Sequence, residues 1–237
     1  MFLPLHDGVP LAHMRTPAVA RLLIIVCVLA YPLTFYGPIG EDWVVAGFGL
    51  IPAVLFETEA LPEGLPFVPE WATLLTSVFL HGSWLHLFGN MLFLWVFGDN
   101  VEDAMGHLRF LLFFLLCGAV AGLTHAFMDP ESTRPLIGAS GGVSGVVAAY
   151  LILYPRVRMW ALFLNGLPLR VPAFWAIGFW FALQLVSAFF GGDEAVGWFA
   201  HLGGFVAGAI LIPVMRKRYD PVLARVEARG LREEPSA

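Results

Sequence analysis

The chain has 237 residues, of which 59% are hydrophobic and only 13% are charged, and its mean hydropathy is +0.78. Soluble domains carry about 25% charged residues, so this composition argues against a soluble protein and indicates one embedded in a membrane. The net charge of −5 is less informative than the position of the charges. Cys27 and Cys117 both lie in apolar runs, which excludes a disulfide framework and any metal spacing built from cysteines.

Six apolar stretches each approach the ~20 residues that a helix needs to cross a bilayer. We predict an all-α polytopic membrane protein whose spans are residues 18–36, 84–98 (helical to 105), 110–128, 136–154, 171–190 and 197–215. The first stretch lacks the cleavage site of a signal peptide, so we expect it to be retained. In the acidic loop 37–83, residues 71–80 are apolar but too short to span, which predicts a helix in the interface or against the bundle.

The basic residues set the orientation of these spans. Of the 13 lysines and arginines, only Arg134 falls on the side opposite the termini. Such a bias predicts that both termini are cytoplasmic, in an inner or plasma membrane, and that the acidic loop is outside. We therefore divide the chain into a cytoplasmic segment 1–17, a membrane domain 18–215 and a cytoplasmic tail 216–237. The basic start of that tail is explained either by contact with anionic headgroups or, more simply, as the flank of the last span.

Residues 138–145 read Gly-Ala-Ser-Gly-Gly-Val-Ser-Gly and open the fourth span. Glycines four apart allow two membrane helices to approach closely, so packing alone could explain the motif. Alternatively, Ser140 is a nucleophile, and the flanking glycines let a substrate reach its hydroxyl. The soluble nucleophile elbow is excluded, because no buried strand is predicted before Gly138.

Polar side chains on three predicted spans reach one layer of the membrane. Ser140 lies ~7 Å below the outer edge and His201 ~6 Å below it, at ~1.5 Å per residue. His86 and Asn90, four residues apart on one helical face, lie ~3 and ~9 Å deep. Two further positions, Gly204 and Gly208, would let the fourth and sixth spans approach each other.

This layer predicts a Ser140–His201 dyad without a carboxylate, with His201 as the base. His86, Asn90 and the backbone N–H of Ser140 would donate hydrogen bonds to an oxyanion. The competing interpretation is that these polar groups only hold the helices together. Ser144, Gln184 and Ser187 are further polar side chains within the predicted spans.

Three motifs in this order resemble the rhomboid intramembrane serine proteases. Residues 81–90, with His81, His86 and Asn90, resemble the family's H-x4-H-x3-N block. Residues 138–141 resemble its GASG motif, and residues 200–208 its AH-x2-G-x3-G motif. Residues 98–106 and 154–156 look like segments of bacterial members.

The resemblance implies a six-transmembrane-helix rhomboid-like bundle with an embedded first loop and a cavity open to the outside. It implies Ser140 as nucleophile, His201 as base and acid, and His86 and Asn90 around the oxyanion. His81, Gly138, Gly141, Gly204 and Gly208 would be structural. Substrates would be single-span membrane proteins cut near the outer surface, and the fifth span with the loop 191–197 would form a gate and cap. No cofactor, metal or nucleic acid is implied.

Two positions depart from the family pattern. Ala72 follows Trp71 where many members have arginine, which puts the anchoring of the first loop in question. Ser144 stands where many members have an aromatic ring stacked on the histidine, so either another group orients His201 or its ring is held more loosely.

Two other functions are considered. A catalytically silent rhomboid-like protein that binds membrane clients would be favoured by loss of the serine or histidine, and both are present. A transporter or proton path through His86 and His201 would be expected to carry carboxylates within the spans, and none lies in the middle of one.

Overall fold

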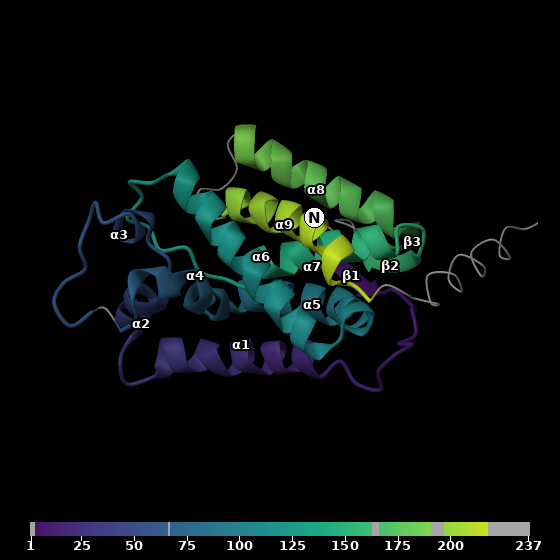
Figure 1. The fold of residues 1–237 in the computed structure, drawn as a ribbon, viewed down its shortest axis with the longest axis horizontal. Helices are drawn as coiled ribbons and strands as arrows, with labels where there is room; N and C mark the ends of the chain where they lie inside the picture. Colours follow the sequence, from purple (N-terminus) through teal and green to yellow (C-terminus); the bar gives the residue numbers. More distant parts are fainter. Residues whose placement is uncertain (1–2, 66, 163–165, 191–196, 218–237) are drawn as a thin grey trace, which may run out of the picture.

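The fold is that of a computed structural model, which describes residues 3–65, 67–162, 166–190 and 197–217. Its main elements are a bundle of long helices and a small sheet at one end (Figure 1). The long helices are α1 (Ala18–Tyr36), α5 (Trp84–Met105), α6 (His107–Met128), α7 (Ser140–Leu153), α8 (Ala173–Phe190) and α9 (Trp198–Met215). The strands are β1 (Leu3–His6), β2 (Arg158–Leu162) and β3 (Pro168–Pro172).

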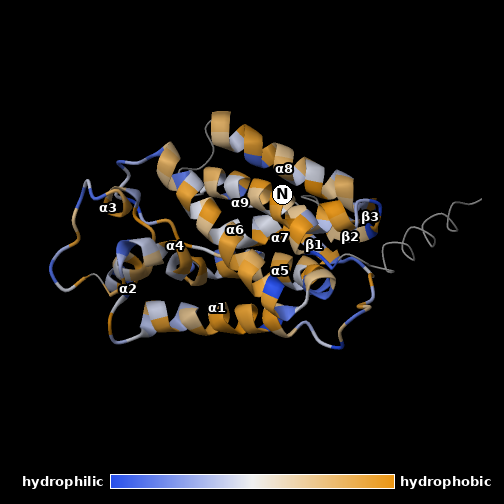
Figure 2. Ribbon diagram, viewed as in Figure 1, coloured by the Kyte–Doolittle hydropathy of each residue, from blue (hydrophilic) through white to orange (hydrophobic). Residues whose placement is uncertain are grey.

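The mostly helical, multi-pass membrane fold predicted from the sequence is confirmed. Among the described residues, four helices are long and apolar enough to cross a membrane: α1, α6, α8 and α9. Apolar residues predominate along these helices (Figure 2), and many large ones are exposed, among them Leu29, Leu112, Phe189 and Val214. α7 has only 14 residues, and α5 carries acidic residues toward its C-terminal end; neither is among these four helices.

The predicted fourth span starts later than expected. Residues 136–139 are not helical: Leu136 pairs with Leu50, and the Gly138 N–H donates to the Ser77 carbonyl. The helix begins at Ser140 itself. This serine therefore lies at a helix N-terminus rather than one turn inside the helix.

The long acidic loop contains helices that the sequence analysis did not predict. These are α2 (Glu41–Phe48) and α3 (Pro52–Leu55). The apolar segment 71–80 forms consecutive short turns instead of one helix: η1 (Glu70–Ala72), α4 (Thr73–Thr76) and η2 (Ser77–Phe79). Thr73, Ser77 and Val78 of these turns are buried, so the segment packs against the bundle.

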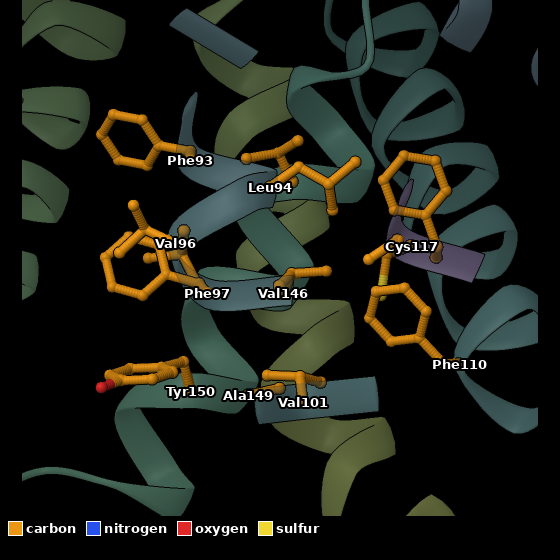
Figure 3. Packing of buried hydrophobic residues seen from close by; sticks show 14 of the residues in the cluster. Phe93, Leu94, Val96, Phe97, Val101, Phe110, Cys117, Val146, Ala149 and Tyr150 are labelled. Atoms are coloured by element: carbon orange, nitrogen blue, oxygen red, sulfur yellow. The ribbon is translucent and has the colours of Figure 1, made fainter. Parts of the chain in front are cut away.

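α7 lies in the middle of the bundle, between α5, α6 and α9, and every residue from Gly141 to Tyr150 is buried (Figure 1). Small residues make this possible. A Cβ added at Gly141 would lie 2.4 Å from the Cβ of Ala121, and one at Gly145 would lie 2.5 Å from the sulfur of Cys117. Farther along the helix, aromatic and branched side chains of α5 and α6 pack around Val146 and Tyr150 (Figure 3).

The N-terminal residues pack against the end of the bundle where α5 ends. β1 pairs antiparallel with β2, and β2 pairs antiparallel with β3. Buried Asp103 of α5 accepts hydrogen bonds from the backbone N–H groups of Ala12, His13 and Met14 at 2.8–2.9 Å. The adjacent Glu102, which has no exposed surface, accepts from the first turn of α1 at Val19 and Ala20. Two carboxylates thus satisfy backbone donors that would otherwise be unpaired.

The start of the C-terminal tail also docks on α5. The Lys217 N–H donates to the Ala104 carbonyl at 3.0 Å, and its ammonium lies 3.4 Å from the Asp103 carbonyl oxygen. The lysine is therefore directed at a protein carbonyl. Residues 218–237 of the expected tail, and residues 191–196 of the expected cap, lie outside the described residues.

Candidate active site

Ser140 is the first residue of α7, and the chain reaches it through a glycine in an unusual conformation. Gly138 has φ = +129°, which a residue with a side chain rarely adopts. A Cβ at Gly138 would lie 2.7 Å from Cε1 and 2.8 Å from Nε2 of His86, and 3.7 Å from Oγ of Ser140. The absence of a side chain at Gly138 therefore lets the His86 ring and the serine hydroxyl share one small space.

The start of α7 also presents backbone donors. The first intrahelical bond runs from the Val143 N–H to the Ala139 carbonyl, and no side chain caps the helix. The N–H groups of Ser140 and its next neighbours have no intrahelical acceptor, and they form the positive end of the helix dipole. This is a favourable environment for a developing negative charge.

α7 and α9 approach each other at their glycines. A Cβ at Gly204 would lie 2.1 Å from the Gly141 carbonyl oxygen, and one at Gly208 would lie 2.3 Å from the Gly145 carbonyl oxygen. Gly141 follows Ser140 directly, and His201 precedes Gly204 by three residues, which is nearly one turn. The contact between the glycines therefore brings the segment with Ser140 and the turn with His201 to the same level.

The His201 ring is held by side chains from two helices. Its Nδ1 lies 3.1 Å from Oε1 of Gln184 on α8. The Trp180 ring, also on α8, stacks at a centroid distance of 6.4 Å and an interplanar angle of 28°. Trp198 packs edge-on at 6.0 Å. The described residues include no hydrogen bond between the Ser140 hydroxyl and the His201 ring; catalytic hydrogen bonds in substrate-free enzymes are commonly long and shorten with substrate bound.

Two residues of the predicted H-x4-H-x3-N block lie deep around this site. His81 is fully buried, and its ring packs edge-on against His86 at 5.2 Å. His81 precedes α5, and burial lowers the pKa of its ring to about 4, with the neighbouring His86 adding to this effect. The neutral ring can therefore accept a hydrogen bond. Its Nε2 lies 3.5 Å from the backbone nitrogen of Ala139, the residue that precedes Ser140. Asn90 is 7% exposed, and its buried amide nitrogen has no hydrogen-bond partner among the described residues.

One histidine beside the site was missed by the sequence analysis. His125 lies near the C-terminal end of α6, and its buried Nδ1 has no hydrogen-bond partner among the described residues. A Cβ at Gly197, at the start of α9, would lie 3.9 Å from the His125 Nδ1. The signal was present, because His125 lies three residues from the outer end of the predicted third span, in the layer of the other polar groups. Within the described part of the chain, no group of three or more His, Cys, Asp or Glu side chains could hold a metal ion.

A profile of the Rhomboid domain matches residues 68–218, well over half of the chain. The chain belongs to the rhomboid family. The matched region of this rhomboid protein contains every predicted site residue, from His81 to Gly208.

Curated relatives support the same assignment. The rhomboid chain is 28% identical to RHOMBOID-like protein 5 of Arabidopsis thaliana over 151 residues, which cover 63% of this chain and 46% of the relative. It is 30% identical over 163 residues to RHOMBOID-like protein 12, mitochondrial, of the same plant, covering 61% and 46% of the two chains. It is 28% identical to Rhomboid protein 1, mitochondrial, of Saccharomyces cerevisiae over 200 residues, which cover 76% of this chain and 55% of the relative. The chain thus spans about half the length of the curated relatives it matches.

Proposed function

We propose that this rhomboid protein is an intramembrane serine endopeptidase that cleaves single-span membrane proteins near the outer face of the bilayer. The observation that carries the proposal is the contact of α7 with α9 at Gly141 and Gly204, next to Ser140 and His201. Two helices in contact through backbone atoms lie closer together than helices that are separated by side chains. This contact therefore supports the predicted pairing of Ser140 with His201.

In the proposed mechanism, Oγ of Ser140 attacks the carbonyl carbon of the scissile peptide bond while Nε2 of His201 takes the hydroxyl proton. The negative oxygen of the tetrahedral intermediate accepts hydrogen bonds from the Ser140 N–H, Asn90 and His86. The unpaired amide nitrogen of buried Asn90 supports this assignment, because a buried donor without a partner is costly unless a substrate atom completes it.

The intermediate then collapses, the C–N bond breaks, and His201 gives the proton to the leaving amine. The remaining acyl group is esterified to Ser140. A water molecule, deprotonated by the same imidazole, attacks the ester and releases the second product. Catalysis in this scheme needs neither a carboxylate nor a cofactor.

For the membrane arrangement we propose six spans, with α5 and α7 crossing together with the four longer apolar helices. Residues 1–17 and 216–237 would then lie in the cytoplasm and residues 18–215 would form the protease domain. Arg134 remains the one basic residue on the other side, and the site would open there. We also propose that the protein is a rhomboid of the bacterial type and lies in an inner or plasma membrane. Two of the relatives named above are mitochondrial by name.

A fluorophosphonate probe tests the proposal, because it reacts only with an activated serine. We expect it to label the purified full chain and the Ser144→Ala control, which removes a buried serine one turn along α7, but not Ser140→Ala. Co-expression with a panel of tagged single-span proteins would then identify substrates. If no serine is labelled and no panel member is cut, a catalytically silent, client-binding rhomboid protein becomes the better description.

A further inference from the structure

A histidine acts as a general base through a ring nitrogen that carries no proton. If Nε2 of His201 is to accept the proton of Ser140, then Nδ1 must carry the ring proton, and an acceptor must hold it there. Ser144 lies where an aromatic ring would have helped to orient the histidine, but its short side chain offers no ring to stack. The orienting group must therefore come from somewhere other than α7.

α8 supplies that group. The side-chain oxygen of Gln184 lies 3.1 Å from Nδ1 of His201, and this is the one hydrogen bond that the ring makes with a described residue. Gln184 is only 6% exposed. The other buried residues of α8, Ala173, Ala176 and Ile177, are apolar and lie in its first two turns. Gln184 is thus the single buried residue of the outer part of α8, and its amide points at the base.

The contact is reinforced by the aromatic rings around His201. Trp180 lies four residues before Gln184, so both side chains project from the same face of α8. The Trp180 ring stacks on the imidazole, and Trp198 packs against its edge. The two rings restrict how the imidazole can turn, but neither defines which nitrogen carries the proton. Only the hydrogen bond to an acceptor does so.

We propose that Gln184 is the positioning residue of this protease: its carbonyl oxygen accepts the Nδ1–H of His201 and leaves Nε2 free to face Ser140. This inference rests on the proposed function. It also means that the reactive geometry depends on three docked helices, because α7 carries the nucleophile, α9 the base and α8 the group that orients the base.

The test compares variants of the full chain in detergent. Gln184→Met keeps the length of the side chain but removes the acceptor, whereas Gln184→Glu keeps an acceptor. Ser187→Ala changes another polar residue of α8 and is the matched control. The readouts are the rate at which a fluorophosphonate labels Ser140 and, with a cleavable single-span substrate, kcat and KM measured separately.

We expect Gln184→Met to lower the labelling rate and kcat by about 10–100-fold, the range seen when the partner that orients a functional histidine is removed. KM should stay within about twofold, because the bond touches no substrate atom. Gln184→Glu should retain most of both rates, and Ser187→Ala should match the wild type.

The inference is overturned if Gln184→Met is labelled at the wild-type rate, or if Gln184→Glu is as slow as Gln184→Met. Should Gln184→Met melt at a lower temperature than the wild type, Gln184→Asn decides the question, since its shorter amide stays polar but falls short of Nδ1. A wild-type labelling rate in that variant rejects the role of Gln184. Labelling that survives Ser140→Ala is a different result and rejects the proposed function itself.

Discussion

The contact between Gly204 and Gly141 gives the most direct test of how the site is assembled. In Gly204→Ala the added methyl would lie 2.1 Å from the Gly141 oxygen, 2.8 Å from its carbonyl carbon and 3.1 Å from its Cα. All three are backbone atoms of a buried helix, so no side chain can rotate away. An ordinary contact begins near 3.4 Å, so α7 and α9 must separate locally by about 1 Å.

That separation has two measurable consequences. Overpacking of this kind costs about 1–3 kcal/mol of folding free energy, and each kcal/mol lowers Tm by about 2–4 °C for a chain of this size. A misplacement of about 1 Å between reacting groups lowers the rate by about 100-fold. We therefore expect Gly204→Ala to lose far more activity than stability.

The assay is fluorophosphonate labelling of Ser140 together with thermal melting in one detergent. Gly178→Ala is the matched control, because a Cβ at Gly178 on α8 meets no atom within 4 Å. It should label normally and melt at or slightly above the wild-type temperature, since alanine favours a helix over glycine. A Gly204→Ala protein that labels and melts like the wild type would show that the close approach of α7 and α9 does not set the geometry of the site.

Three further predictions concern single side chains. Asn90→Ala should lower kcat by about 100–1000-fold with little change in KM, as loss of an oxyanion donor does, and a normal kcat would remove Asn90 from the oxyanion site. Glu102→Gln should lower stability by about 2 kcal/mol, because the amide can no longer accept from both Val19 and Ala20; an unchanged melting temperature would contradict this reasoning. Burial raises the pKa of the Asp7 carboxyl, although the hydrogen bond from Tyr150 opposes the shift. The stability that protonated Asp7 contributes is therefore complete below the pKa of the unfolded chain and is lost as pH rises through the raised folded pKa. Melting curves should show Asp7→Asn equal to the wild type at low pH and more stable at neutral pH, and parallel pH profiles for the two proteins would refute this.

The polar residues on the predicted spans could be found from the sequence because a membrane makes them conspicuous. In a chain with so few charges, His86, Asn90, Ser140 and His201 stand out at one depth, and the glycine spacing in spans four and six indicates close packing. The long helices were found for the same reason, since the apolar run that crosses a bilayer has a length fixed by the bilayer.

The late start of the fourth helix was harder to predict. Leu136 and Ile137 are as apolar as the helix that follows, so hydropathy cannot locate the point where it begins. The turn at Gly138 and the pairing of Leu136 with Leu50 end the extended segment and put Ser140 at a helix N-terminus. Strand β1 was missed because its pairing partner, β2, lies more than 150 residues away in the sequence.

The sequence by itself determined the family of this protein and the chemistry available to it, because a hydroxyl, two imidazoles and an amide are features of residue type and spacing. Only the tertiary structure decided which groups meet. Gln184 appears in the sequence as one more polar residue in an apolar helix, and its significance depends on how α8 is rotated against α9. In the structure, Trp180 and Phe181 of α8 pack against Phe205 of α9, and such contacts between distant segments are not encoded by any local pattern of residues.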